Sequence, residues 1–154
     1  MNTDLPRRKR NRLEGYDYSQ NGAYFITVCT RDKAPLLGRV IACSAQNTAY
    51  VSLTPLGLAT ERVLTRLSDV EKYVIMPNHV HMLLLLEEEK HAVPRIMRYW
   101  KSMITREIGK SIWQRSYYDH TIRDQREYDL IWEYIETNPL RWALDRYYFE
   151  PESL

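Results

Sequence analysis

Hydrophobic residues follow two different periods along the chain, and each period predicts a different kind of element. Five segments are rich in β-branched, aromatic and other apolar residues, which indicates β-strands. These predicted strands span residues 24–30, 39–43, 49–53, 70–76 and 79–86. The last of them continues as an unbroken apolar run after His81, which favours a central strand that is covered on both faces.

Three other segments place apolar residues three and four positions apart, which is the spacing of one helix face. The predicted helices span about 54–67, 94–109 and 123–137. Thr54 can cap the first of them, with Pro55 at the first helical position. The third ends at Asn138, because Pro139 disfavours helical backbone for the residue before it.

The order of these elements predicts an α+β fold, in which a mostly antiparallel sheet carries helices on one face. The chain has 154 residues, a length typical of a single domain. We divide it into a basic N-terminal arm, residues 1–22, and one domain, residues 23–154. The aromatic segment 112–121 is assigned neither to a strand nor to a helix.

Composition adds one global and one local feature. The chain has 12 Tyr and 4 Trp but only 2 Phe, and aromatic side chains with a polar end suit half-exposed surfaces and base stacking. The net charge of +2 gives no global argument for nucleic acid. Basic residues nevertheless cluster in the arm and in 94–115, where they could follow a phosphate backbone. A solvated face and a flexible arm explain the same clusters equally well.

Some classes of protein are excluded by what the sequence lacks. Cys29 and Cys43 make neither a disulfide framework nor a zinc site. The N-terminus has no apolar segment of the signal-peptide kind, and no apolar run approaches the ~20 residues of a membrane span. We therefore expect a reduced, cytoplasmic protein, associated with the nucleoid if it binds DNA.

Two histidines stand at the start of the last predicted strand. Side chains alternate along a strand, so His79 and His81 lie on one face and can reach one metal ion. Two histidines that hydrogen-bond the backbone at a sheet edge are the alternative explanation. The spacing differs from that of zinc proteases, and no cysteine lies close by. A third oxygen ligand with open positions would suit Mg²⁺ or Mn²⁺.

The third predicted helix carries a tyrosine and an asparagine on one side. Tyr134 and Asn138 are four residues apart and so lie one turn apart, beside the apolar face of that helix. Tyrosine can serve as a covalent nucleophile, and an asparagine oxygen is a hard metal ligand. Taken alone, an ordinary boundary tyrosine and a helix-capping asparagine are the simpler explanation.

Several short motifs occur in a characteristic order. They are Met76-Pro77-Asn78-His79-Val80-His81, Trp113-Gln114-Arg115, Asp119-His120 and Tyr134-Ile135-x-x-Asn138-Pro139. In this order and spacing the chain resembles the IS200-like single-tyrosine transposases, which carry a His-hydrophobic-His (HUH) motif. The REP-associated tyrosine transposases are the branch that it resembles most. The resemblance covers about residues 24–142.

The resemblance implies a fold and a set of site residues. The fold would be a ferredoxin-like sandwich with an additional C-terminal helix that carries the tyrosine. His79, His81 and Asn138 would be ligands of a divalent metal, Mg²⁺ or Mn²⁺, and Tyr134 would be the nucleophile. The partner would be single-stranded or hairpin DNA, bound by a monomer or a homodimer. Our candidate DNA contacts are Arg7, Arg8, Lys9, Arg10, Arg12, Arg95, Arg98, Lys101 and Arg115.

The resemblance implies an endonuclease and strand transferase that acts through a 5′-phosphotyrosine. A domesticated, non-cleaving hairpin-DNA-binding protein of the same fold is the first alternative. A replication initiator or relaxase is a second, although the chain has no room for a helicase domain. A small metal-dependent hydrolase that uses water is the third, and it would leave no protein–DNA adduct.

Overall fold

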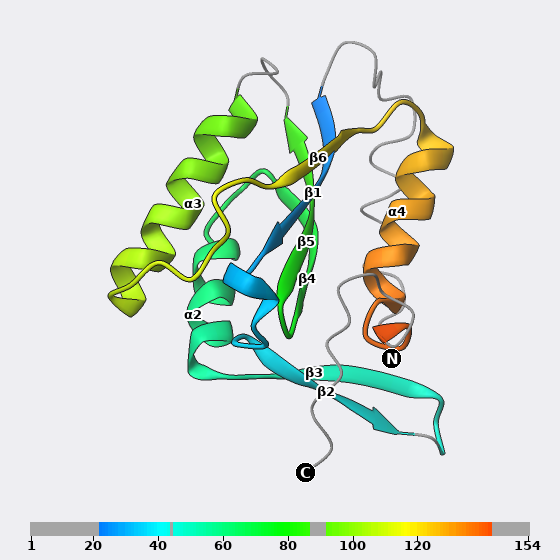
Figure 1. Ribbon diagram of the computed structural model, residues 1–154. Helices are drawn as coiled ribbons and strands as arrows, with labels where there is room; N and C mark the ends of the chain where they lie inside the picture. Colours follow the sequence, from blue (N-terminus) through cyan, green and yellow to red (C-terminus); the bar gives the residue numbers. More distant parts are fainter. Residues whose placement is uncertain (1–21, 44, 87–91, 143–154) are drawn as a thin grey trace.

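The computed structural model describes residues 22–43, 45–86 and 92–142 (Figure 1). Its strands are β1 (Gly22–Cys29), β2 (Gly38–Cys43), β3 (Thr48–Leu53), β4 (Val70–Met76), β5 (His79–Leu86) and β6 (Tyr118–Thr121). Its helices are η1 (Arg31–Lys33), α2 (Pro55–Leu64), α3 (Ala92–Ile108) and α4 (Gln125–Thr137). The five predicted strands and three predicted helices are all present, and β6 is an additional strand.

The main sheet has the strand order β4-β5-β1-β6, and every pair that it contains is antiparallel. Following the chain through β1, α2, β4, β5, α3 and β6 gives the βαββαβ connectivity of a ferredoxin-like sandwich. The predicted fold class is therefore confirmed. β5 and β1 occupy the centre, so both histidines of the HUH motif lie on a central strand, as predicted.

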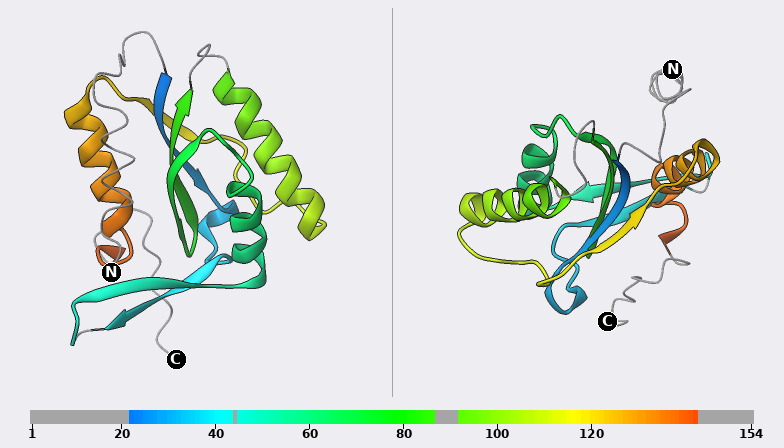
Figure 2. Two further views of the ribbon diagram at one scale, coloured as in Figure 1. Left: turned by 180° about the vertical axis from the view of Figure 1, so that it is seen from behind. Right: turned by 90° about the horizontal axis from the view of Figure 1, so that it is seen from above.

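Helices cover the two faces of this sheet unequally. In Figures 1 and 2, α2 and α3 lie on one face, and α4 lies alone on the other. The larger core cluster joins one side of the sheet to α2 and α3 through side chains such as Val63, Met97 and Trp100. The smaller cluster joins Leu83 to Tyr128 and Trp132 of α4. The tyrosine-bearing helix thus closes the side of the sheet opposite to the other two helices.

The hairpin of β2 and β3 forms a separate two-stranded sheet and projects beyond the main one (Figure 1). Its burial pattern is mixed, and Tyr50 at its outer face is 62% exposed. Among the described residues, no helix is long and apolar enough to cross a membrane.

The start of α2 depends on a glycine. Thr54 caps the helix, since its hydroxyl oxygen accepts a hydrogen bond from the Gly57 amide at 3.2 Å. A Cβ on Gly57 would lie 2.0 Å from the carbonyl oxygen of Leu37 and 3.1 Å from Leu53 Cβ. The Leu37 carbonyl is itself fixed, because it accepts a hydrogen bond from the Thr54 amide at 2.9 Å.

We expect Gly57→Ala to destabilise the fold. Replacing glycine in a helix gains up to about 1 kcal/mol of helix propensity, but overpacking against backbone costs about 1–3 kcal/mol. Urea unfolding should therefore show a lower midpoint for Gly57→Ala. Leu58→Ala, at a neighbouring position that is 46% exposed, is the control and should change the midpoint less. A midpoint for Gly57→Ala at or above wild type would contradict the close contact.

Candidate active site

The sheet face that α4 covers carries polar side chains in neighbouring rows. In one row, Thr27 of β1 pairs with His81 of β5 and with Tyr118 of β6. In the next row, Phe25 pairs with Leu83 on one side and with His120 on the other. Alternation along β1, β5 and β6 therefore brings two histidines and a tyrosine to the same face.

Both histidines of the HUH motif are buried and held by neighbours. His79 is 0% exposed and His81 is 2% exposed, and their ring centroids are 4.6 Å apart. The Nδ1–H of His79 donates to Asn78 Oδ1 at 2.7 Å, and His81 Nδ1 lies 2.8 Å from Thr27 Oγ1. Fixing Nδ1 in this way makes Nε2 of each ring the nitrogen that would bind a metal.

The other wall of the site comes from α4 and the turn that follows it. The Tyr134 ring lies against His81, with centroids 5.3 Å apart. Beyond the helix, the Trp142 ring stacks on His79 at 6.2 Å. The segment between these two residues, with Asn138 at its middle, therefore runs alongside the histidine pair. The structure thus brings Tyr134 to the histidines, on the helix face that the sequence predicts.

Asn138 has an unusual environment for an asparagine. Its side chain is 0% exposed, and neither Oδ1 nor Nδ2 has a hydrogen-bond partner among the described residues. Leaving a buried amide unsatisfied costs about 1–3 kcal/mol. A ligand on Oδ1 would remove part of that cost, so this side chain fits the role of a third metal ligand.

The donor set decides which kind of metal fits. Within the described residues, no group of three or more His, Cys, Asp and Glu side chains could hold an ion. The candidate set is therefore two imidazoles and one amide oxygen. Such a weak set, with positions left for water or phosphate oxygens, suits Mg²⁺ or Mn²⁺ better than a structural zinc ion.

A pocket of about 390 Å³ opens beside the tyrosine. It is lined by Phe25, Thr27, His81, Tyr118, His120, Glu127, Leu130, Ile131 and Tyr134. The pocket thus contains the predicted nucleophile Tyr134 and the predicted metal ligand His81. It also contains His120 and Glu127, to which the sequence analysis assigns no role. The Asp119-His120 motif and the helical alignment of Glu127 with Tyr134 were the only signals for them.

His120 and Glu127 are in direct contact across the gap between β6 and α4. His120 Nε2 contacts Glu127 Oε1, and Glu127 Oε2 accepts a hydrogen bond from the Arg123 amide at 3.0 Å. Burial acts to raise the pKa of Glu127, but the hydrogen bonds from His120 and the Arg123 amide outweigh it and lower that pKa. The carboxylate is therefore kept charged beside the imidazole.

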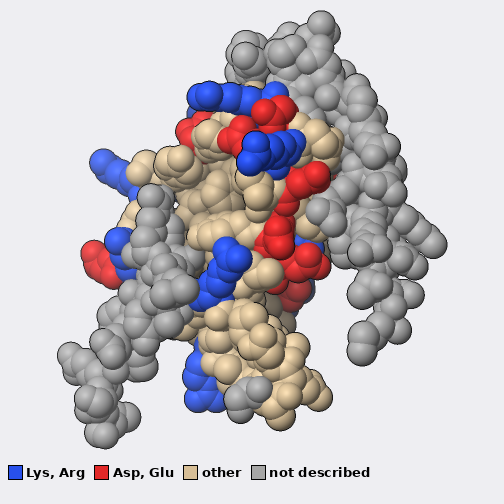
Figure 3. All heavy atoms as spheres, turned by 90° about the vertical axis from the view of Figure 1, so that its right-hand side faces the viewer, with Lys and Arg blue, Asp and Glu red and all other residues tan. Residues whose placement is uncertain are grey.

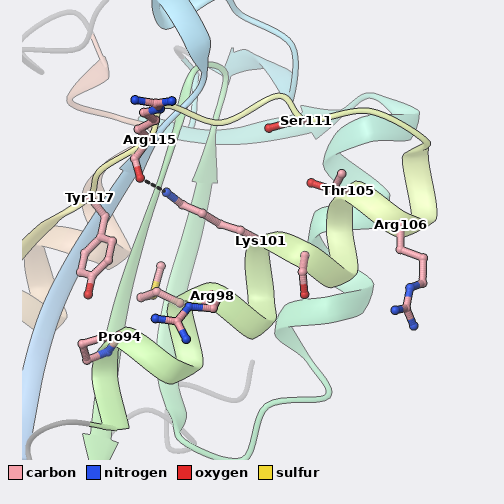
Figure 4. Close-up of a pocket in the computed structure, with 10 residues that line it drawn as sticks. Pro94, Arg98, Lys101, Thr105, Arg106, Ser111, Arg115 and Tyr117 are labelled. Atoms are coloured by element: carbon pink, nitrogen blue, oxygen red, sulfur yellow. Dashed lines mark hydrogen bonds between the residues drawn. The ribbon is translucent and has the colours of Figure 1, made fainter.

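A second, basic groove lies on the opposite side of the sheet, between α3 and the segment that leads to β6 (Figure 4). Its volume is about 700 Å³, and its lining includes Arg98, Arg106, Arg115 and Tyr117. Tyr117 and Tyr118 are adjacent in the chain but line different pockets, one on each side of the sheet. The edge strand β6 thus separates the basic groove from the tyrosine pocket.

Lys101 has a structural task that the sequence did not indicate. Its Nζ donates hydrogen bonds to the carbonyl oxygen of Gln114 at 2.9 Å and to that of Arg115 at 3.1 Å, the second of which is drawn in Figure 4. Burial lowers the pKa of Lys101. This side chain fixes the segment before β6, and its predicted DNA contact stays a prediction.

The remaining predicted DNA contacts divide into two groups. Arg95, Arg98 and Arg115 are exposed, and the last two line the basic groove. Arg7, Arg8, Lys9, Arg10 and Arg12 lie outside the described residues.

The outer face of α4 has the opposite charge. Figure 3 shows acidic side chains gathered along this side of the molecule, and Glu133 and Glu136 of α4 are both exposed. DNA phosphates would be repelled there.

Comparison with known proteins gives a consistent set of relatives, although no protein-family model matches the chain. An uncharacterized protein of Haemophilus influenzae is 29% identical over 97% of both chains. A REP-associated tyrosine transposase of Escherichia coli is 27% identical over 80% of this chain and 70% of its own. A putative REP-associated tyrosine transposase of Haemophilus influenzae is 23% identical over 81% of this chain and 74% of its own.

A solved structure agrees with these sequence matches. A REP-associated tyrosine transposase bound to a REP hairpin has a TM-score of 0.59 and 25% identity, over 82% of this chain and 72% of that chain. The ferredoxin-like sheet, its histidine pair and the facing tyrosine fit the class of IS200-like single-tyrosine transposases. Within that class, the matches support assignment of the chain to the REP-associated tyrosine transposases.

Proposed function

We propose that the chain binds hairpin-bearing single-stranded DNA and cleaves it by covalent attachment to Tyr134. The contact between the Tyr134 ring and His81 carries this proposal, because it joins a nucleophile to one histidine of the HUH pair in one pocket. The structural relative that is bound to a REP hairpin supports the choice of DNA. An intact set of Tyr134, both histidines and Asn138 favours a cleaving enzyme over a domesticated binder.

His79 Nε2, His81 Nε2 and Asn138 Oδ1 would hold the divalent metal. When bound there, Mg²⁺ or Mn²⁺ would supply positive charge that lowers the cost of crowding negative charge on the phosphate. Asn78 and Thr27 hold the two rings through Nδ1, and second-shell contacts of this kind commonly change metal affinity by about 10–100-fold.

In the proposed reaction, the Tyr134 hydroxyl loses its proton and its oxygen attacks the phosphorus atom. The bond between phosphorus and the 3′ oxygen breaks, and that oxygen leaves with the electron pair and takes up a proton. The product is a 5′-phosphotyrosine and a 3′-hydroxyl. A second 3′-hydroxyl can reverse the step without ATP, because one phosphodiester replaces another.

Charge sets the proposed path of the DNA. Phosphates would bind in the basic groove at Arg98 and Arg115, while the cleaved nucleotide would cross the β6 edge into the tyrosine pocket. Tyr117 and Tyr118 stand on this path and could stack on unpaired bases. The acidic outer face of α4 stays outside the path (Figure 3).

A denaturing gel tests the proposed function. The purified chain is mixed with labelled single-stranded oligonucleotides that carry a hairpin from the DNA flanking its gene, with Mn²⁺ or with EDTA. A labelled band at the mass of protein plus DNA, absent in EDTA, supports a tyrosine nuclease and strand transferase. A gel shift under native conditions with no adduct over a panel of flanking sequences would instead favour the domesticated binder.

The basic groove makes a prediction about salt. Arg98→Ala with Arg115→Ala removes two phosphate contacts, so the slope of log Kd against log salt should fall by roughly 0.7 per contact on single strands. Fluorescence anisotropy over a salt series measures it. Arg39→Ala, which removes an exposed arginine of β2, is the control and should keep the wild-type slope. An unchanged slope in the double variant would place the DNA elsewhere.

A further inference from the structure

We infer that His120, held by Glu127, is the general base that takes the proton of the Tyr134 hydroxyl during attack. This inference rests on the proposed function and adds a residue to it. Unperturbed tyrosine has a pKa near ~10, so attack at neutral pH needs a group that accepts the proton. The tyrosine pocket contains such a group.

The fold places His120 and the nucleophile on either side of Phe25, in the lining of one pocket. His120 and Phe25 are paired residues of the antiparallel strands β6 and β1, so their side chains stand side by side on one face. The Phe25 ring in turn meets the Tyr134 ring edge-on, with centroids 6.0 Å apart. Phe25 is thus a common neighbour of the histidine and the tyrosine, and all three line the pocket.

The positions of Glu127 and Tyr134 on α4 agree with this arrangement. Glu127 and Tyr134 are seven residues apart on α4, which is two turns along one face. Side chains of a helix lean toward its N-terminus, so Tyr134 leans toward the end where Glu127 holds His120. The opposite end of the site, at Trp142 and His79, lies beyond the tyrosine.

The Glu127 carboxylate gives a neutral His120 the chemistry of a base. Glu127 is anchored twice, since its Oε2 accepts from the Arg123 amide and its own amide donates to Asp124 Oδ1 at 2.8 Å. Its carboxylate engages His120 Nε2. Nδ1 is therefore the nitrogen that accepts the proton, and the carboxylate stabilises the imidazolium that results. In catalytic triads, a carboxylate orients the histidine base and stabilises its imidazolium in the same way.

The other groups around the pocket serve less well. His81 Nδ1 lies against Thr27, and its Nε2 is assigned to the metal. Tyr118 is a phenol, so its ordinary acidity equals that of the nucleophile. Arg123 lies beside Glu127 and only adds positive charge. Of the titratable groups that line the pocket, which are His81, Tyr118, His120, Glu127 and Tyr134, His120 alone combines an imidazole with a carboxylate partner.

The proton transfers of this step involve only Tyr134, His120, the 3′ oxygen and water. The proton of the Tyr134 hydroxyl moves to His120 Nδ1 as the bond from oxygen to phosphorus forms. The 3′ oxygen leaves with its electron pair and takes a proton from water. In the rejoining step, the attacking 3′-hydroxyl gives its proton to water, and the His120 imidazolium returns its proton to the departing tyrosine oxygen.

The test is the rate of adduct formation in a single turnover, measured for His120→Ala, Glu127→Gln and the control Glu133→Gln. Glu133→Gln removes one carboxylate from the exposed side of the same helix. We expect His120→Ala to slow the step by about 100- to 10,000-fold, Glu127→Gln to slow it less, and Glu133→Gln to leave it unchanged. Hairpin affinity and the circular dichroism spectrum should match wild type in all three.

Three further readouts separate a base from a structural residue. Added imidazole should restore part of the rate of His120→Ala, and the acidic limb of the pH–rate profile should be lost in that variant. Replacing Tyr134 alone by a fluorotyrosine, whose phenol is more acidic, should shrink the defect of His120→Ala. A rate for His120→Ala within about threefold of wild type, or a defect that neither imidazole nor fluorotyrosine changes, would overturn the inference.

Failure of the inference and failure of the proposed function give different results. If wild type forms the Tyr134 adduct and His120→Ala forms it equally fast, only the role of His120 is wrong. If wild type forms no adduct over the panel of flanking hairpins, the proposed function is wrong, and with it the role of His120.

Discussion

Tyr134→Phe is expected to abolish covalent attachment to DNA while hairpin affinity stays within about twofold of wild type. The substitution removes only the hydroxyl, which is the proposed nucleophile. The phenyl ring keeps its contacts with His81 and Phe25, so the shape of the pocket is retained. Losing a nucleophile that acts as part of a unit removes nearly all of the rate.

Tyr118→Phe is the matched control for that experiment. Tyr118 lines the same pocket and is 48% exposed, so the variant loses one hydroxyl from the same place. It should form the adduct at a rate near wild type. An adduct in Tyr134→Phe at the wild-type rate would remove the nucleophile assignment, and Tyr117, Tyr118 and Tyr128 would be tested in its place.

The combined variant His79→Ala and His81→Ala is expected to lose metal-dependent cleavage by more than about 100-fold, because even second-shell groups of metal sites are worth about 10–100-fold. Calorimetric titration with Mn²⁺ should show the loss directly. The two substitutions also remove partners of Asn78 and Thr27, so part of the effect is on stability. Thermal unfolding of the variant must therefore accompany the titration.

Asn138 gives a cleaner comparison at the same site. Asn138→Asp keeps an oxygen where the metal ligand is proposed, whereas Asn138→Ala removes it. We expect Asn138→Ala to bind Mn²⁺ more weakly than Asn138→Asp. Equal Mn²⁺ affinity in wild type, both variants and the double histidine variant would contradict the metal site, as would undiminished cleavage in EDTA.

The strands could be predicted from the sequence wherever burial imposes a pattern. Val70–Met76 and His79–Leu86 have the predicted bounds. Apolar residues fill the central strand β5, and the edge strand β4 ends in the buried pair Ile75 and Met76. β6 was not predicted, since Tyr118–Thr121 is a four-residue edge strand with two exposed residues at its start. Its pairing with β1 is a tertiary contact, and nothing in Tyr-Asp-His-Thr alone requires it.

The same limit applies to the site. His79, His81 and Tyr134 were accessible to prediction because strand alternation and helical spacing fix their faces. The pairing of His120 with Glu127 joins β6 to α4, so it depends on a strand that the sequence did not indicate. Lys101 is similar, because its hydrogen bonds to the segment before β6 follow from the path of the chain. From the sequence, the positive charge of Lys101 suggested a DNA contact and gave no sign of these hydrogen bonds.

The most direct test of the central claim is a map of the adduct. Wild-type chain is reacted with hairpin DNA and Mn²⁺, treated with nuclease and trypsin, and examined by mass spectrometry. The peptide that spans residues 127–141 contains both Tyr128 and Tyr134, so fragmentation separates the two. A phosphonucleotide on Tyr134 is the predicted result. A phosphonucleotide on another residue, or cleaved DNA with no modified peptide, would contradict the account.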